Sequence, residues 1–143
     1  MTIEEIEEMW KKDSIIDPDN LHEESLKIPQ LHSKYYNIYN MITLLRERAR
    51  ETYNRVYLER HNYYTGKAPA EVYVENPFPY KIREKDALQR HISADERLNK
   101  IDMKIRYYDV MLKFLEEIIK CVSNRGFHIK NSIDFMKSIL FLM

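Results

Sequence analysis

The segment Leu31–Gly66, LHSKYYNIYNMITLLRERARETYNRVYLERHNYYTG, decides the fold. Residues spaced alternately four and three apart form one seam along it, apolar as far as Ala49 and more polar beyond. The seam comprises Leu31, Tyr35, Ile38, Ile42, Leu45, Ala49, Thr52, Val56, Glu59 and Tyr63. This spacing is typical of a helix that packs along one side. We therefore predict a long helix over about residues 30–65, ended by Gly66 in a left-handed conformation.

A second long helix is predicted over about residues 94–122. Ser93-Ala-Asp-Glu96 has the pattern of a capping box, in which the Ser93 and Glu96 side chains satisfy exposed amides. Apolar residues three and four apart follow without a break: Leu98, Ile101, Ile105, Tyr108, Leu112, Leu115, Ile119 and Val122. We expect Asn124-Arg-Gly126 to end this helix. Its apolar face packs against either the first long helix or another copy of itself.

The other segments are shorter. Residues 3–12 have apolar side chains on one side and predict a short N-terminal helix. Residues 67–80 contain Pro69, Pro77 and Pro79 without helical periodicity, so we expect an extended loop, and residues 81–91 predict another short helix. The fold class is therefore all-α, with two long antiparallel helices, a short N-terminal helix and a C-terminal assembly helix.

The last segment, from about residue 129 to the terminus, carries an apolar stripe. The residues expected to serve assembly are Phe127, Ile129, Ile133, Met136, Ile139 and Leu140. A monomer that exposed such a stripe would tend to aggregate. Burial inside the same chain is one solution, and burial between subunits of a homo-oligomeric ring or bundle is the one that we predict.

Composition excludes several classes of protein. Of the 143 residues, 44% are hydrophobic, yet no apolar run approaches the roughly 18 residues that a membrane span needs, and no signal peptide is evident, so we expect a soluble cytosolic protein without membrane contact. The single Cys121 excludes an internal disulfide framework and a cysteine-based zinc site. The chain also lacks a phosphate-binding loop, a nucleophile elbow and a His-Glu-x-x-His pair. We predict no catalytic residue, no metal and no cofactor.

The zero net charge hides an uneven distribution. Residues 1–33 carry three basic and nine acidic residues, whereas residues 34–67 carry seven basic and three acidic residues. In this basic part, Arg and Tyr recur three or four apart, and proteins hold single strands with cations along the phosphates and aromatic faces against the bases. The candidate nucleic-acid-binding residues are Arg50, Arg55, Tyr57, Arg60, Tyr63, Tyr64, Gly66 and Lys67.

An alternative explains the same series without DNA. In it, the tyrosines pack between helices while Arg–Glu pairs involving Glu47, Glu51 and Glu59 occupy the surface. The protein would then be a coiled-coil scaffold or adaptor.

Five stretches, taken in order over about residues 8–135, resemble the UvsY family of recombination mediators from T-even-like phages. They are Lys11-Lys12-Asp13 with Ile16-Asp17, Ser33-Lys34, Arg60-x-x-Tyr63-Tyr64-Thr65-Gly66, Ser93-Ala94-Asp95 with Lys100-x-Asp102, and Arg125-Gly126-Phe127-x-Ile129-Lys130. The resemblance implies a non-enzymatic protein of phage recombination, replication and repair, acting in the cytoplasm of the infected bacterium. Its expected partners are single-stranded DNA, the phage single-stranded DNA-binding protein and a RecA-like recombinase of the UvsX type, which it helps to load.

The resemblance also implies a site and an assembly. The family's basic DNA-binding motif falls on Arg60 and the Tyr63–Gly66 stretch, whereas the family's lysine two positions earlier is replaced by Leu58. The implied homo-oligomer is expected to be a hexamer or heptamer. We divide the chain accordingly into residues 1–125, which bind DNA and partners, and residues 126–143, which form the oligomerisation helix.

Overall fold

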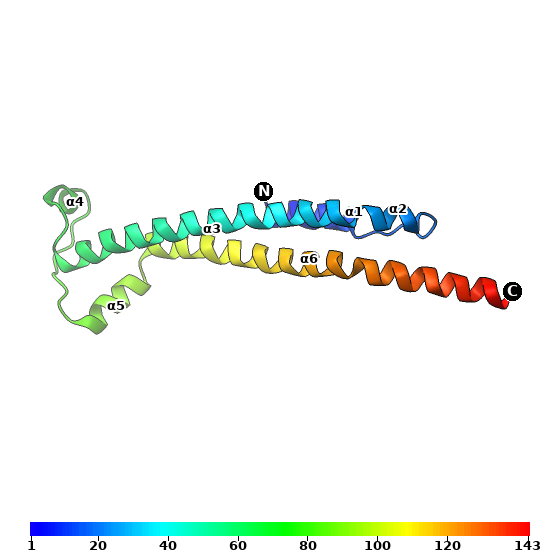
Figure 1. Cartoon of the computed structure of the whole chain (residues 1–143). Coiled ribbons are helices and arrows are strands. Elements are labelled where there is room, and N and C mark those ends of the chain that lie inside the picture. Colours follow the sequence, from blue (N-terminus) through cyan, green and yellow to red (C-terminus); the bar gives the residue numbers. More distant parts are fainter. The chain divides into compact units, whose positions relative to one another are not determined.

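The structure is a computed structural model that describes residues 1–143, and all of its regular elements are helices (Figure 1). The helices are α1 (Ile3–Asp13), α2 (Leu21–Leu26), α3 (Ile28–Thr65), α4 (Ala70–Glu75), α5 (Lys85–Ser93) and α6 (Glu96–Leu142). They form two compact units, which we call the terminal unit (residues 1–42 and 110–143) and the central unit (residues 43–109). The all-α prediction is confirmed. None of the helices is long and apolar enough to cross a membrane.

Helix α3 follows the seam of the sequence. It begins at Ile28, with Pro29 in the first turn, where a missing amide costs no intrahelical hydrogen bond. At its end, Gly66 has a φ of 79°. The amide of Lys67 donates to the Asn62 carbonyl over 2.8 Å, and that of Gly66 to the Tyr63 carbonyl over 3.3 Å. These are the hydrogen bonds of a Schellman motif, which confirms the predicted left-handed terminator.

Helix α6 corrects the expectation of two separate helices near the C-terminus. It runs unbroken from Glu96 to Leu142, so Gly126 does not end it. Glycine inside a helix costs only about 1 kcal/mol relative to alanine, and here the buried stripe continues on both sides of it. The buried residues of α6 are Leu98, Met111, Leu115, Ile118, Val122, Arg125 and Ile129. Residues 126–143 are thus the end of a longer helix, and their separate function stays a prediction.

In the terminal unit, α1 packs against the first part of α3. The rings of Trp10 and Tyr35 meet edge to face with centroids 5.6 Å apart. Oδ2 of Asp13 accepts hydrogen bonds from the Tyr35 hydroxyl and the Lys34 ammonium group, each over 2.7 Å. From α6, Nη2 of the buried Arg125 donates to the carbonyl of Ile15 over 3.1 Å. The start of the chain is therefore tied to both long helices of this unit.

In the central unit, α4 and α5 lie where α3 ends and α6 begins (Figure 1). Helix α4 replaces part of the extended loop expected over residues 67–80. Helix α5 begins at Lys85 rather than Lys81, because the amide of Ile82 donates to the Tyr64 carbonyl over 3.0 Å and holds this segment against the end of α3. The core of this unit comprises Tyr63, Tyr64, Ile92 and Leu98, with Tyr53, Val56, Ala68, Val72, Tyr73, Phe78, Ile82 and Leu88 packed around them.

Candidate nucleic-acid interface

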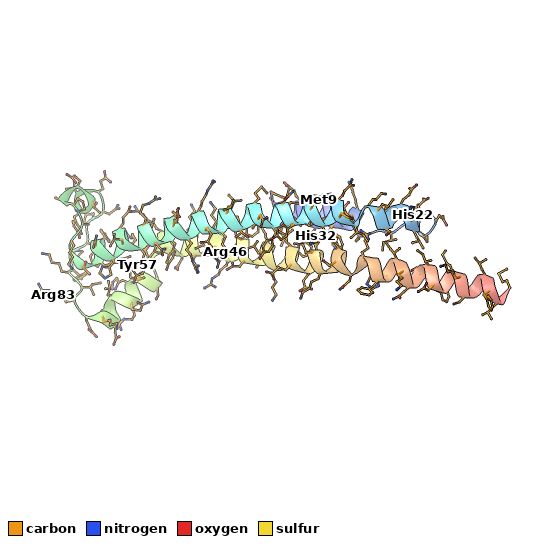
Figure 2. All side chains as sticks on the ribbon, viewed as in Figure 1. Met9, His22, His32, Arg46, Tyr57 and Arg83 are labelled. Carbon is orange, nitrogen blue, oxygen red and sulfur yellow. The ribbon has the colours of Figure 1, made fainter.

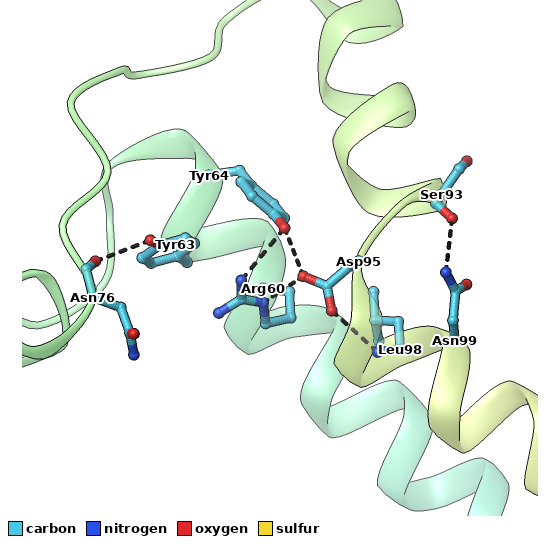
Figure 3. Close-up of polar contacts among 8 residues, drawn as sticks. All are labelled: Arg60, Tyr63, Tyr64, Asn76, Ser93, Asp95, Leu98 and Asn99. Atoms are coloured by element: carbon cyan, nitrogen blue, oxygen red, sulfur yellow. Dashed lines mark hydrogen bonds and ion pairs between the residues drawn. The ribbon is translucent and has the colours of Figure 1, made fainter.

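Arg60, the central residue of the predicted site, forms an ion pair inside the central unit (Figure 3). Its Nε lies 2.6 Å from Oδ2 of Asp95, and the Tyr64 hydroxyl donates to the same oxygen over 2.6 Å. The Arg60 and Asp95 side chains are only 14% and 2% exposed. The Asp95 carboxylate is therefore shielded from water, and it connects the end of α3 to the start of α6.

Asp95 also caps α6. Its Oδ1 accepts a hydrogen bond from the amide of Leu98 over 3.1 Å, as an N-cap aspartate does. The sequence-based prediction had assigned this role to Ser93, which is instead the last residue of α5. The Ser93 carbonyl accepts a hydrogen bond from the Asn99 side chain over 3.2 Å (Figure 3). The predicted capping box is therefore wrong. Asp95 caps α6 instead, and it connects the start of this helix to Arg60.

The electrostatics of this cluster favour the charged pair. Burial raises the pKa of the Asp95 carboxyl, but hydrogen bonds from Tyr64, Arg60 and the Leu98 amide outweigh burial and hold that pKa below its usual value. Burial lowers the pKa of the Arg60 guanidinium, whereas the hydrogen bond to Asp95 raises it, and the net pKa is raised. Burial and the Asp95 hydrogen bond both raise the pKa of the Tyr64 hydroxyl. At neutral pH the cluster therefore holds a carboxylate, a guanidinium and a neutral phenol.

Tyr63 and Tyr64 are buried in the same cluster, at 7% and 8% exposure. The Tyr63 ring stacks on that of Tyr73 with centroids 5.5 Å apart, and the guanidinium carbon of Arg60 lies 4.4 Å from its centre. The Tyr64 ring meets Phe78 edge to face at 5.4 Å. A base can stack on neither tyrosine unless these neighbours move. Both tyrosines are therefore packed inside the fold, which is the alternative that the sequence left open.

The other residues predicted on α3 divide between two faces. Arg50 and Tyr57 are seven residues apart and lie on one side of the helix, whereas Arg55 points about 140° away from Arg50 at about 100° per residue. Tyr57 is 37% exposed and is one of the side chains labelled in Figure 2. Arg50 and Arg55 are exposed and form no ion pair within the chain. Their charges are thus free to meet a phosphate, on two different faces of the helix.

Lys67 is exposed and unpaired just after Gly66, beside cations that the sequence-based prediction missed. The side chain of Lys81 lies over Gly66, where a Cβ would stand 2.7 Å from its Cγ. Tyr80 is 68% exposed, and Arg83 projects from the segment before α5 (Figure 2). The signal in the sequence was the alternation Tyr80-Lys-Ile-Arg83, which the expected helix over residues 81–91 obscured.

The residues predicted to serve assembly are placed unequally. Ile129 is 3% exposed and is covered by its own chain, which corrects its expected place in a subunit interface. Ile133 is partly buried. Phe127 and Leu140 are 70% and 71% exposed, and Met136 and Ile139 are 45% and 43% exposed. The last turns of α6 have no neighbouring element in Figure 1.

The chain contains no group of three or more His, Cys, Asp or Glu side chains that are close enough to hold a metal ion. The arrangement offers cations and aromatic rings, which bind charged and planar groups.

Comparison with known proteins gave consistent matches. The family described as "Recombination, repair and ssDNA binding protein UvsY" matches residues 9–139. The recombination protein uvsY of Enterobacteria phage T4 is 29% identical over 136 residues, which cover 94% of each chain. Two crystal structures of the bacteriophage T4 recombination mediator protein UvsY also match. In lattice type II the TM-score is 0.83 at 27% identity, covering 97% of both chains. In lattice type I the TM-score is 0.82 at 27% identity, covering 94% of this chain and 98% of the other.

Proposed function

Because the chain belongs to the UvsY family of recombination, repair and single-stranded DNA-binding proteins, we propose that it acts as a recombination mediator in the infected bacterial host. In this role it binds single-stranded DNA that is covered by the phage single-stranded DNA-binding protein and helps a RecA-like recombinase to replace that cover. The chain acts through binding and assembly rather than through a chemical step.

One observation carries the DNA-binding part of the proposal: the central unit exposes cations that no carboxylate of the chain neutralises. They include Arg50, Arg55, Lys67, Lys81 and Arg83. Unpaired cations release counterions when they meet phosphates, which is the main source of affinity for a nucleic-acid backbone. Arg60 has a different part in this proposal. It orients the end of α3 and the start of α6 through Asp95, and the exposed cations contact the strand.

Assembly of several copies completes the proposal. A cavity of about 580 Å³ in the terminal unit lies between residues 16–21 and residues 128–139 of α6, and its walls include Ile16, Leu21, Phe135, Met136 and Ile139. Beside it, Phe141 and Leu142 are 93% and 86% exposed. We propose that another copy covers these apolar groups, as the expected hexamer or heptamer requires. Each copy then needs only a few cations, because a strand that is bound by one copy meets the next copies at a high effective concentration, which raises the overall affinity.

A salt titration with a labelled oligodeoxythymidine tests the DNA-binding part. We expect affinity to fall steeply as salt rises, with each lost phosphate contact lowering the slope by about 0.7 for a single strand. The double variant Arg55→Ala with Lys67→Ala should therefore lower the slope by about 1.4 per copy engaged. Lys113→Ala, which removes an exposed cation from the terminal unit, serves as the control and should leave the slope unchanged.

The mediator part needs a second measurement. With single-stranded DNA first coated by the phage binding protein, the chain should shorten the lag before the recombinase begins to hydrolyse ATP. A chain that binds no DNA at low salt and leaves this lag unchanged would instead be the scaffold or adaptor of the alternative hypothesis.

A further inference from the structure

A groove in the central unit lies just beyond the end of α3. It has a volume of about 530 Å³ and is lined by Gly66, Ala68, Ala70, Tyr73, Pro77, Phe78, Pro79, Tyr80 and Lys81. Small residues form part of the lining, and the rings of Tyr, Phe and Pro and the Lys81 side chain form the rest. No carboxylate lines it. We call it the 66–81 groove.

The groove is held open by contacts within the chain. The Tyr73 hydroxyl donates to the Tyr63 carbonyl over 2.9 Å and accepts from the Ala68 amide over 3.3 Å, which fixes the small-residue wall. The hydrogen bond from the Ile82 amide to the Tyr64 carbonyl holds the side formed by the adjacent Tyr80 and Lys81. Because both walls are attached to the end of α3, the site is formed before any ligand arrives, and binding needs little ordering of the chain.

Tyr80 is the accessible aromatic residue of this groove. It is 68% exposed, and its ring meets that of Phe78 at 78° with centroids 5.7 Å apart. An edge contact of this kind steadies a ring while leaving a face of it free. This is the property that Tyr63 and Tyr64 lack, because Tyr73, Arg60 and Phe78 cover their rings.

The charges beside the groove suit a phosphate chain. Lys81 lies at its rim, Lys67 directly follows Gly66, and neither forms an ion pair. Aromatic surface flanked by cations matches the chemistry of a single strand, in which an unpaired base offers a planar face and its neighbours carry phosphates. Bases inside a duplex stay stacked and offer no such face.

We propose that the 66–81 groove receives one unstacked base of a single strand on the ring of Tyr80, with Lys67 and Lys81 beside the flanking phosphates. The proposal deepens the proposed function and rests on it. It assigns base contact to the segment between α3 and α5, whereas the sequence-based prediction assigns that contact to tyrosines of α3, namely Tyr57, Tyr63 and Tyr64.

The test compares two labelled strands of equal length, an oligodeoxythymidine and an abasic deoxyribose-phosphate chain, at one salt concentration. We expect the wild-type protein to bind the oligodeoxythymidine more tightly. Tyr80→Ala should weaken that binding by about 5- to 150-fold, from typical base–aromatic stacking, and should not change binding of the abasic strand. Tyr80→Phe, which keeps the ring, is the matched control and should bind as the wild type does. Because the Tyr80 side chain is largely exposed, neither change is expected to unfold the protein.

Each other outcome contradicts the proposal in a distinguishable way. If the wild type binds both strands equally well, or Tyr80→Ala weakens both equally, the protein binds DNA but the groove holds no base. If the wild type binds neither strand, the proposed function fails together with the groove. Lys81→Met, which keeps the carbon chain over Gly66, should lower the salt slope by about 0.7 with either strand, and an unchanged slope would remove Lys81 from the phosphate path.

Discussion

Replacing Asp95 by asparagine tests whether Arg60 is held by the fold or is free to contact DNA. The substitution keeps the size of the side chain and keeps a good N-cap for α6, since asparagine and aspartate cap about equally well. It removes the negative charge that Arg60 and Tyr64 share over 2.6 Å each. The change therefore isolates the ion pair from the cap.

The size of the effect follows from burial. Removing one partner of a buried pair costs about 3–5 kcal/mol, because the other charge is left without compensation. The Arg60 side chain is 14% exposed and can reach some water, so we expect the lower end of that range, about 3 kcal/mol of unfolding free energy. Arg60→Met in addition to Asp95→Asn removes the uncompensated charge and should recover most of the loss.

The assay is urea denaturation of the wild type, Asp95→Asn, Arg60→Met and the double variant. All are measured at one protein concentration, because the apparent stability of an oligomer depends on concentration. Ser93→Ala is the matched control. Its side chain does not cap α6 in the structure, so its effect should stay within about 0.5 kcal/mol. A loss below about 1 kcal/mol for Asp95→Asn, or a large loss for Ser93→Ala, would refute the assignment of cap and pair.

Three further predictions address pH, the two glycines and the tail. Burial raises the pKa values of Asp13 and Asp95, but hydrogen bonds outweigh burial and hold both values below the usual one. The two carboxylates should therefore stabilise the fold fully above about pH 4, and this stabilisation should be lost as the pH falls through their lowered folded pKa values. In an acid titration, Asp95→Asn should lose less unfolding free energy between these pH values than the wild type does. Gly66→Ala should destabilise the protein by about 1–2 kcal/mol because of the left-handed φ of Gly66. Gly126→Ala should stabilise it by about 0.5–1 kcal/mol, because the added Cβ lies inside a helix and would stand 4.0 Å from Cδ1 of Ile28, without a clash. Thermal unfolding measures both. Deletion of residues 135–143 should reduce the sedimenting species to monomers or small oligomers, and an oligomer of unchanged size would contradict a role for the exposed tail.

The long helices were predictable where one periodicity extended over many turns. The seam of α3 is confirmed almost to its ends, because its apolar residues lie on one face whatever the packing partner is. The C-terminal part was harder. The sequence Asn124-Arg-Gly126 has the composition of a helix end, but a buried Arg125 and a buried Ile129 continue the stripe and keep the helix intact. Local composition was outweighed there by packing.

The site was less predictable, because its residues come from three segments that only the fold brings together. The Arg/Tyr series on α3 indicated cations and rings but not which of them face inward, and burial reverses the expectation for Tyr63 and Tyr64. Asp95 was visible as part of a capping pattern, yet nothing local showed that it would accept a hydrogen bond from Arg60. Tyr80 was hidden in a proline-rich segment without periodicity.

The stretches that carried the family resemblance turn out to contact one another. Lys34 pairs with Asp13 in the terminal unit, and Arg60 pairs with Asp95 in the central unit. A charge that is neutralised inside its own chain releases no counterions when DNA binds, so it adds little to the salt dependence of affinity. A variant of Arg60 that binds DNA less tightly at an unchanged salt slope, and that is also less stable, therefore indicates a positioning role. Loss of slope without loss of stability would instead mean that Arg60 leaves Asp95 to meet a phosphate.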